Sequence, residues 1–387
     1  MYDFDKIVER ENTSSIKYDM RMQMFDNKDV TPLWVADMDF ETPHFVREAI
    51  IKRAEHPIYG YSLRGETYTN SIIDWVERKH DWKINKDWIV FSPGIVPALN
   101  FATLTFTKPG DAILAQPPVY FPFFTAATDH NRIISESTLI YEDGGYTIDF
   151  DDFRVKSKNA KLFFLSSPHN PTGRVWTKDE LIQLADICME NDVIIVSDEI
   201  HNDLILPDNK HTPIASISDE IADITITCIA PSKTFNLAGM ATSSLIISNQ
   251  KLRDKMQSII NSLHVSLGNI FGAIASEAAY THGYEWVAEL MEYVSGNLTV
   301  LRDTLSSSNS CIKLVEPEAT YMAWLDFNET GYDDDKIKNI IINEAKLGLS
   351  HGPIFGDGGS GFQRINLASP RTIVTNASDR LCKAFKR

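Results

Sequence analysis

The sequence Ala230-Pro231-Ser232-Lys233-Thr234-Phe235-Asn236-Leu237-Ala238-Gly239 follows a β-branched run at residues 224–227. That run predicts a buried strand, and Pro231 predicts that the chain turns where the strand ends. A lysine at such a turn, here Lys233, is placed to point into a cleft. Crowded lysines lose pKa readily and can then bind a carbonyl carbon covalently. A solvated surface lysine is the alternative, and the segments upstream decide between the two.

Strands and helices alternate along the middle of the chain. Apolar runs predict strands at 89–92, 112–115, 162–166, 193–197, 224–227 and 245–247, and the segments between them predict helices at 95–106 and 178–191. A capping box formed by Thr177 and Glu180 supports the second helix. Continuous apolar strands separated by helices predict an α/β fold with a mostly parallel sheet covered on both faces.

The carboxyl ends of these strands predict where a ligand binds, because ligands of parallel sheets lie outside that edge. Five residues follow strand ends and are expected in one crevice: Gly94, Tyr120, Asn170, Asp198 and Lys233. Gly94 also precedes a helix. That arrangement binds phosphate through free amides and the helix dipole, although it also occurs without a ligand.

Asp198 and Lys233 lie about one helix-and-strand step apart. An amine and an acid at neighbouring strand ends suit pyridoxal 5′-phosphate (PLP), since the amine binds the aldehyde and the carboxylate keeps the ring nitrogen protonated. Asp198 could instead cap a helix. Asn170 could bind the phenolic oxygen of the ring or only shape its turn. Tyr120 could stack on the ring or pack in the core.

The two ends of the chain predict a second, smaller unit. Residues 1–30 are polar and predict an extended arm, whereas residues 32–40 are too apolar for a loop. Further elements are expected as helices at 43–55 (opened by Pro43), 66–80, 333–346 and 371–386, a long helix after 285, and strands at 319–327 and 362–367. The predicted regions are 1–45 (N-terminal arm and part of the small domain), 46–284 (large PLP-binding domain) and 285–387 (small C-terminal domain). Residues 356–361 match G-x-G-x-x-G, but a strand follows them, so we interpret them as a turn.

The composition is that of an ordinary globular protein, with 43% hydrophobic and 23% charged residues. A formal net charge of −16 argues against nucleic acid as a partner. No run is long enough to span a bilayer and the N-terminus lacks an apolar signal region, so we expect a cytoplasmic protein. The four cysteines show no metal-binding spacing, and Cys188 and Cys228 are predicted to be reduced core thiols.

Three motifs together resemble the fold-type I PLP enzymes of aminotransferase class I/II: H-N-P-T-G at 169–173, S-D-E-I-H at 197–201 and A-P-S-K-T-F-N-L-A-G at 230–239. Within them, P-L-W-V-A-D-M-D-F at 32–40 and His201 resemble the MalY/PatB group of cysteine-S-conjugate β-lyases, which includes cystalysin. The match runs from about residue 30 to 386. It implies a large domain with a mostly parallel, seven-stranded sheet between helices, a smaller α+β domain, and a homodimer with shared active sites.

The resemblance implies roles around the cofactor ring. Lys233 would bind the cofactor covalently and move the proton at the substrate α-carbon. Asp198 would pair with the ring nitrogen, and Asn170 and His201 would contact the phenolic oxygen. Tyr120 would stack on the ring.

The resemblance also implies phosphate and substrate contacts. Phosphate would be bound by Gly94, Ile95, Val96 and Ser232, with Tyr61 reaching the phosphate of the neighbouring subunit. The substrate would be bound by Arg364, Asp37, Ala36 and Asn170, with Arg364 forming a bidentate pair with its carboxylate. A surface ion pair is the alternative for Arg364. The catalytic residues would be Lys233, Tyr61 and Tyr120.

Two positions depart from the family pattern. Many relatives have an arginine that grips phosphate where this chain has Ala241, so amides and hydroxyls must neutralise the phosphate here. Cystalysin-like sequences have a second tyrosine after the stacking one, whereas Phe121 follows Tyr120 in this chain. No proton-relay role of that hydroxyl transfers to this protein.

The resemblance implies a PLP-dependent C–S β-lyase that cleaves L-cystathionine, L-cysteine or related cysteine S-conjugates. Elimination would give pyruvate, ammonia and a thiol, either homocysteine or sulfide. Two alternatives remain open, namely an aminotransferase that uses the same lysine and a regulatory protein with residual lyase activity. The expected partners are a sulfur amino acid and a second copy of the chain, with no metal, nucleic acid or membrane.

Overall fold

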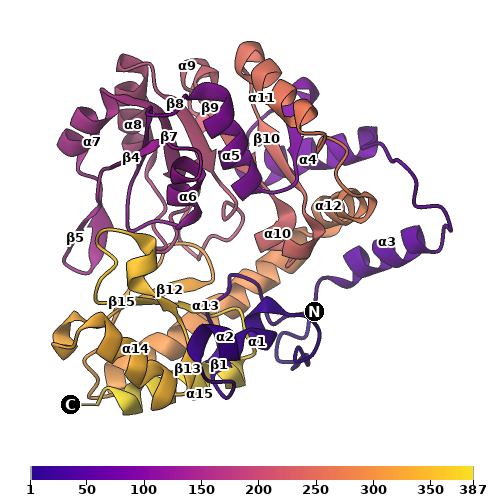
Figure 1. Cartoon of the computed structure of the whole chain (residues 1–387). Helices are drawn as coiled ribbons and strands as arrows, with labels where there is room; N and C mark the ends of the chain where they lie inside the picture. Colours follow the sequence, from indigo (N-terminus) through magenta and orange to yellow (C-terminus); the bar gives the residue numbers. More distant parts are fainter. Residues whose placement is uncertain (1, 387) are drawn as a thin grey trace.

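Seven strands form the central sheet of the larger lobe, in the order β2-β10-β9-β8-β7-β3-β4 (Figure 1). The computed structural model describes residues 2–386. The strands are β2 (Ile89–Ser92), β3 (Ala112–Ala115), β4 (Ile133–Glu136), β7 (Ala160–Ser166), β8 (Ile194–Asp198), β9 (Thr225–Ile229) and β10 (Ser243–Ile246). Only β10 runs antiparallel to its two neighbours, so the predicted mostly parallel, seven-stranded sheet is confirmed.

Helices cover both faces of this sheet because the apolar side chains of its strands point alternately to opposite sides. On β7, Leu162 and Phe164 pack with α5, α6 and α11, whereas Phe163 and Leu165 pack with α7 and α8. The helices of this lobe are α3 (His44–Ala54), α4 (Glu66–His80), α5 (Ile95–Phe106), α6 (Pro122–Thr128), α7 (Phe150–Ser157), α8 (Lys178–Glu190), α9 (Asp219–Asp223), α10 (Pro231–Thr234), α11 (Gln250–Ser262) and α12 (Ile270–His282). Short 3₁₀ turns are η1 (Lys86–Trp88), η2 (Ile214–Ser216) and η3 (Ala238–Met240), and β5 (Ile140–Glu142) pairs with β6 (Gly145–Thr147).

Local sequence signals set most of these boundaries. The capping box of Thr177 and Glu180 is present at the start of α8, as predicted. The prediction that Pro43 is the first helical residue is wrong by one position. Pro43 caps α3, which begins at His44.

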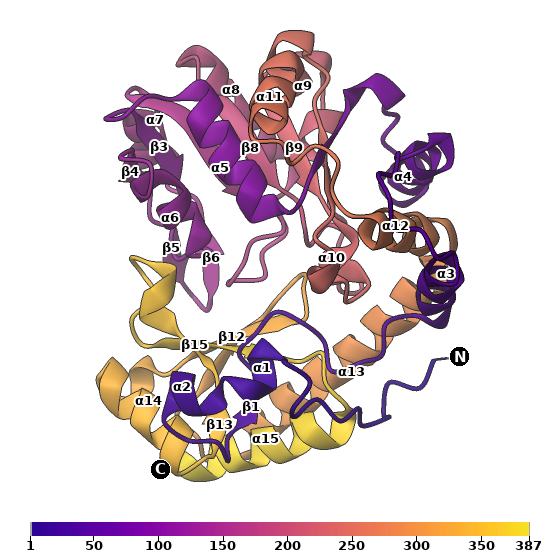
Figure 2. The same ribbon diagram turned by 45° about the vertical axis from the view of Figure 1, so that its right-hand side comes forward.

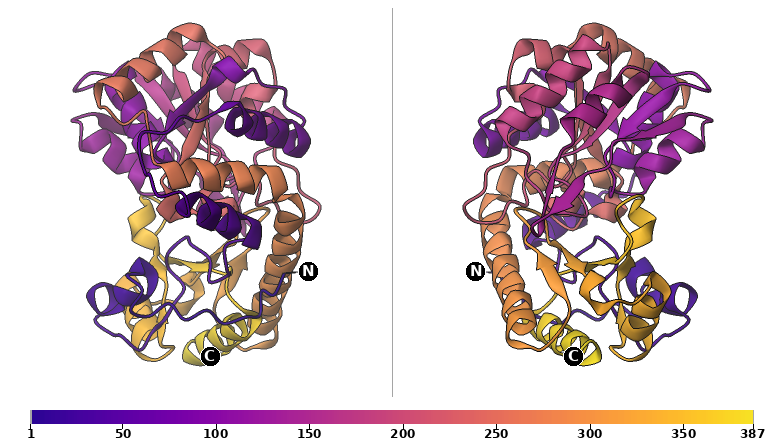
Figure 3. Two further views of the ribbon diagram at one scale, coloured as in Figure 1. Left: turned by 90° about the vertical axis from the view of Figure 1, so that its right-hand side faces the viewer. Right: turned by 90° about the vertical axis from the view of Figure 1, so that its left-hand side faces the viewer.

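The smaller lobe is an antiparallel four-stranded sheet packed with helices, which confirms the predicted α+β unit. Its elements are α13 (Tyr284–Ser307), β11 (Lys313–Val315), β12 (Met322–Asp326), η4 (Asn328–Thr330), α14 (Asp334–Asn343), β14 (Ser350–His351), η5 (Gly352–Phe355), β15 (Phe362–Asn366) and α15 (Arg371–Ala384). Figure 3 shows α13 running along one side of the molecule from the larger lobe into the smaller one. The loop at 356–361 is followed by β15, as expected for a turn.

The N-terminal segment is more ordered than the extended arm that its sequence predicts. It contains α1 (Ile16–Asp19) and α2 (Arg21–Phe25), and β1 (Thr31–Pro32) pairs in parallel with β13 (Leu347–Gly348) of the smaller lobe (Figure 2). Phe4 is buried against Phe40, with 4.9 Å between their ring centroids. We propose the domain division 1–45, 46–284 and 285–387. The β1–β13 pairing and the start of α13 at Tyr284 support it.

Residues 33–43 form a loop without helix or strand, although their apolar character predicted otherwise. Leu33, Met38 and Phe40 are buried within it. A buried loop must satisfy its backbone polar groups, and here side chains from both lobes do so.

No helix between residues 2 and 386 is long and apolar enough to cross a membrane. Cys188 and Cys228 are buried free thiols, as predicted. Burial raises the pKa of both thiols above the ordinary range.

Candidate active site

The strand-end residues line a single cavity of about 300 Å³ at the carboxyl edge of the large sheet. We call it the strand-end cavity. Its lining includes ten of the predicted site residues: Ala36, Gly94, Ile95, Val96, Tyr120, Asn170, Asp198, His201, Ser232 and Lys233. The five strand-end residues that we expected in one crevice, Gly94, Tyr120, Asn170, Asp198 and Lys233, all lie on this lining.

Lys233 extends from α10 into this cavity. Its Nζ donates a hydrogen bond to the carbonyl oxygen of Ala36 at 2.8 Å. Burial and then the nearby charge of Arg364 lower the pKa of Lys233 to about 8, whereas Asp37 and Asp198 act in the opposite direction. The amine is therefore more easily deprotonated than an exposed lysine.

Asp198 is the last residue of β8, between β7 and β9. It is buried, and its Oδ1 accepts a hydrogen bond from the backbone N–H of Ile200 at 3.2 Å. Burial raises the pKa of this carboxyl to about 7, although Ile200 and Lys233 favour the charged form. A cation brought next to Asp198 would stabilise its carboxylate.

Arg364 on β15 is buried and held by three neighbours. Its Nη1 donates to Asn170 Oδ1 at 2.8 Å, and its Nη2 donates to the carbonyl of Trp34 at 3.1 Å and to Ser350 Oγ at 3.2 Å. Arg364 Nε is buried and has no hydrogen-bond partner among residues 2–386. A guanidinium that is held in place and keeps one unpaired N–H donor is suited to binding a carboxylate.

Two other buried polar atoms on the strand-end cavity lack a hydrogen-bond partner in the described chain, His201 Nδ1 and Thr242 Oγ1. Burial, with Lys233 and Arg364 nearby, lowers the pKa of His201 to about 3, so its imidazole is neutral. Sequence reasoning missed Thr242, whose only signal is a hydroxyl next to Ala241. It also missed Tyr321, whose hydroxyl donates to the Ala36 carbonyl at 3.1 Å.

The cavity also receives the N-terminus of α5. Gly94 caps this helix, and the first amides of a helix have no partner within it. Ile95 and Val96 lie in that first turn and line the cavity together with Ser232. Ala241 lines the cavity too, where many relatives place an arginine. Amides and hydroxyls therefore dominate this end of the cavity.

Three predicted residues are not part of this lining, namely Arg364, which contacts Asn170 from β15, and Tyr61 and Asp37. Tyr61 is 98% exposed on the loop between α3 and α4. Asp37 lines a separate cavity, and its carboxylate pairs with the guanidinium of Arg10 at 2.7 and 3.2 Å. Its carboxylate is therefore engaged by the N-terminal segment, while the preceding residue, Ala36, presents its carbonyl to Lys233.

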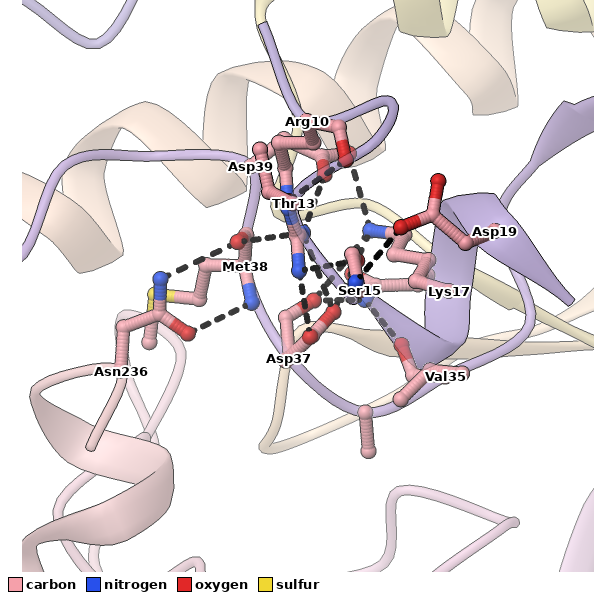
Figure 4. Close-up of polar contacts among 12 residues, drawn as sticks. Arg10, Thr13, Ser15, Lys17, Asp19, Val35, Asp37, Met38, Asp39 and Asn236 are labelled. Carbon is pink, nitrogen blue, oxygen red and sulfur yellow. Dashed lines mark hydrogen bonds and ion pairs between the residues drawn. The ribbon is translucent and has the colours of Figure 1, made fainter. Parts of the chain in front are cut away.

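The loop 34–38 is held through its carbonyl oxygens, and Figure 4 shows Arg10, Lys17 and Asn236 around Asp37 and Met38. The donors are Ser350 and Arg364 to Trp34, Asn366 to Val35, Lys233 and Tyr321 to Ala36, Lys17 and Asn366 to Asp37, and Arg10 and Asn236 to Met38. These donors come from the N-terminal segment and from both lobes. They explain how an apolar loop is buried without regular secondary structure.

A buried ion-pair network supports the far side of this loop. Lys17 Nζ lies 2.8 Å from Asp39 Oδ2, and Arg10 Nη1 lies 2.7 Å from Asp39 Oδ1. Although burial acts against it, Lys17 lowers the pKa of Asp39 below its ordinary value. The network ties the N-terminal segment to the loop that carries Ala36.

Comparison with known proteins identifies the fold and then the family. A PLP-bound structure from Clostridium difficile 630, provisionally described as an aminotransferase, superimposes with a TM-score of 0.98 at 40% identity over 100% of both chains. PLP-containing cystalysin from Treponema denticola gives a TM-score of 0.96 at 38% identity, over 99% of this chain and 98% of that one. The fold is that of the fold-type I PLP-dependent transferases.

The family model Aminotransferase class I and II matches residues 28–381, and the chain belongs to that family. Cystathionine beta-lyase PatB of Bacillus subtilis (strain 168) is 41% identical over 384 residues, covering 99% of both chains. The resemblance to the MalY/PatB group that the motifs indicated is confirmed.

Proposed function

We propose that this protein is a PLP-dependent carbon–sulfur β-lyase that cleaves L-cystathionine, L-cysteine or related cysteine S-conjugates. The observation that carries the proposal is one cavity lined by the Lys233 amine and the buried Asp198 carboxyl, next to the fixed guanidinium of Arg364. The 41% identity to a protein named cystathionine beta-lyase supports the type of reaction.

The residues present fit PLP at each of its polar groups. Lys233 supplies the amine for the aldehyde, Asp198 the acid for the ring nitrogen, and Asn170 and His201 donors for the phenolic oxygen. The buried, unpartnered His201 Nδ1 and Thr242 Oγ1 are what a cavity built for a polar ligand presents. When bound, PLP supplies a ring that accepts electrons from the substrate α-carbon.

The amides of the first turn of α5 and the hydroxyls of Ser232 and Thr242 would hold the phosphate. This assignment needs no arginine at position 241.

The protein's own residues would bind and deprotonate the substrate. Arg364 would bind the carboxylate through its free Nε, while Asn170 keeps the guanidinium in place. The Lys233 amine, whose pKa is lowered to about 8, would remove the α-proton. Tyr120, which lines the cavity, would stack on the PLP ring and keep the ring in position. The Cβ–S bond then breaks, and the conjugate and one water give pyruvate, ammonia and the thiol.

An aminotransferase is the second candidate, favoured by the family and by the description of the C. difficile structure. The two reactions differ in a simple assay. We expect the purified protein to release pyruvate from L-cystathionine without any keto-acid acceptor. Turnover that requires such an acceptor would assign the protein to the aminotransferases.

A cytoplasmic homodimer is part of the proposal. Tyr61 and Leu63 are 98% and 92% exposed on one loop, and Ile58 and Tyr59 beside them are also exposed. A second copy covering this loop would bury these side chains and bring Tyr61 to its phosphate site. Light scattering measures the mass, and Tyr61→Phe should weaken PLP binding in a titration; a monomeric holoenzyme would contradict the dimer.

A further inference from the structure

A second, larger cavity of about 630 Å³ adjoins the strand-end cavity. We call it the apolar cavity. The two share Ala36, Tyr120 and Lys233, and Arg364 also lines the larger one. Its other walls are mainly apolar and include Met24, Phe25, Trp34, Ile341, Ile342 and Leu349.

The position of the apolar cavity indicates that it receives the part of the substrate beyond Cβ. Arg364 and Lys233 lie on its lining, and these two residues are proposed to hold the substrate carboxylate and to take the α-proton. A substrate held at both points has the apolar cavity next to its side chain. The S-substituent is therefore the group that enters it.

The charges on the lining of the apolar cavity are unbalanced. None of the described residues that line it is an aspartate or a glutamate. Its lining includes three cationic side chains, Lys233, Arg364 and the exposed Lys338. The distal ammonium group of cystathionine would therefore enter without an acidic partner, and an unpaired charge in an apolar site is costly.

We propose that this enzyme prefers cysteine conjugates whose S-substituent is uncharged and apolar over cystathionine. The inference rests on the proposed lyase function and narrows its substrate class. Apolar walls favour each buried methylene group, and the absence of acidic residues disfavours a distal ammonium.

A homologous series tests this preference. The holoenzyme is assayed for pyruvate with L-cysteine, its S-methyl, S-ethyl, S-propyl and S-butyl derivatives, and L-cystathionine. We expect kcat/KM to rise about fourfold per added methylene and to be higher for S-butyl-L-cysteine than for L-cystathionine. A flat series or a preference for cystathionine would overturn this inference while leaving the lyase intact. No pyruvate from any of these compounds would instead overturn the proposed function.

Two methionines of α2 provide a matched pair of variants. Met24 and Met22 are 43% and 55% exposed, but only Met24 lines the apolar cavity. We expect Met24→Glu to lower the ratio of kcat/KM for S-butyl-L-cysteine to that for L-cysteine about tenfold. The same variant should raise the ratio for cystathionine by offering a carboxylate to its distal ammonium. Met22→Glu should change none of these values. Equal effects of the two variants on kcat/KM, at equal melting temperatures, would contradict the placement of Met24 in the wall of the apolar cavity.

Lys338 is the remaining charged group to test. We expect Lys338→Met to leave S-butyl-L-cysteine the better substrate. The opposite outcome has two parts: the parent enzyme prefers cystathionine, and Lys338→Met lowers kcat/KM for cystathionine alone. That result would show that Lys338 recognises the distal carboxylate of cystathionine, and it would overturn the proposal.

Discussion

The two cavities that meet at Lys233 are built in different ways. The strand-end cavity takes most of its lining from residues 93–242, at the ends of neighbouring strands. Its Asn170, Asp198, His201 and Thr242 side chains are buried. The apolar cavity is assembled from the N-terminal segment, the loop 34–36 and residues 338–364 of the smaller lobe. The comparison teaches that the proposed chemistry depends on short motifs beside strands, whereas the proposed selectivity depends on packing between distant segments.

The largest expected effect concerns Lys233, which lines both cavities. We expect Lys233→Ala to reduce pyruvate release by about 10⁴-fold or more, because the same amine binds the cofactor and moves the proton. The circular dichroism spectrum and the melting temperature should stay close to those of the parent apoprotein. Undiminished pyruvate release would refute the assignment of Lys233.

The loop 34–38, which carries Ala36 on the lining of both cavities, is expected to depend on the buried ion pairs beside it. Lys17→Met leaves the Asp39 carboxylate buried with only part of its charge compensated, so we expect a loss of about 3–5 kcal/mol in the free energy of unfolding. Arg302→Met, which removes an exposed pair with Glu316, is the matched control and should cost less than about 1 kcal/mol. Urea denaturation measures both, and equal losses would contradict a special role for the buried network.

Arg364 lines the apolar cavity and donates to Asn170 of the strand-end cavity, so its substitution sharpens the comparison. Arg364→Lys keeps the positive charge but loses the two parallel N–H donors of the guanidinium, and we expect kcat/KM to fall about 10- to 100-fold. The factor should be the same for S-methyl- and S-butyl-L-cysteine, because the carboxylate and not the S-substituent loses its partner. A loss that differs strongly between the two substrates would show that Arg364 also reads the S-substituent.

The smallest effect concerns the pH dependence of stability. Burial raises the pKa of Asp198 from 3.8 to about 7 in the folded apoprotein. The native state then binds this proton more tightly than the unfolded chain, so the contribution of Asp198 to stability falls as pH rises from about 4 to about 7. We expect Asp198→Asn to be more stable relative to the parent at pH 8 than at pH 5, by about 1–3 kcal/mol. A pH-independent difference between the two apoproteins would contradict the raised pKa.

Several elements followed from local sequence. Helix α4 spans the predicted 66–80, α5 spans the predicted 95–106, and Thr177 caps α8. Apolar periodicity and capping act within a few residues, so they are visible in a single chain. Asp198 and Lys233 could also be located from local sequence, because each follows an apolar run that predicts a strand.

Other features could not be predicted in this way. Residues 32–40 were predicted to be too apolar for a loop, but residues 33–40 lie in one, and the carbonyls of Val35 and Asp37 are satisfied by the distant side chain of Asn366. Thr242 carries only a weak local signal, a hydroxyl next to Ala241, and Tyr321 carries none because the packing of the smaller lobe places it beside Ala36. Arg364 was found through the family motif and not from its surroundings in the sequence.

By itself the sequence determined the alternation of strands and helices, the carboxyl edge where polar residues gather, and the family. Only the tertiary structure decided that Met24, Trp34 and Ile341 share one apolar cavity beside Lys233, and that the carboxylate of Asp37 is engaged by Arg10. The physical reason is the distance along the chain over which the deciding interactions act. Strand and helix preferences depend on neighbouring residues, whereas the shape and charge of a cavity depend on which distant segments pack against each other.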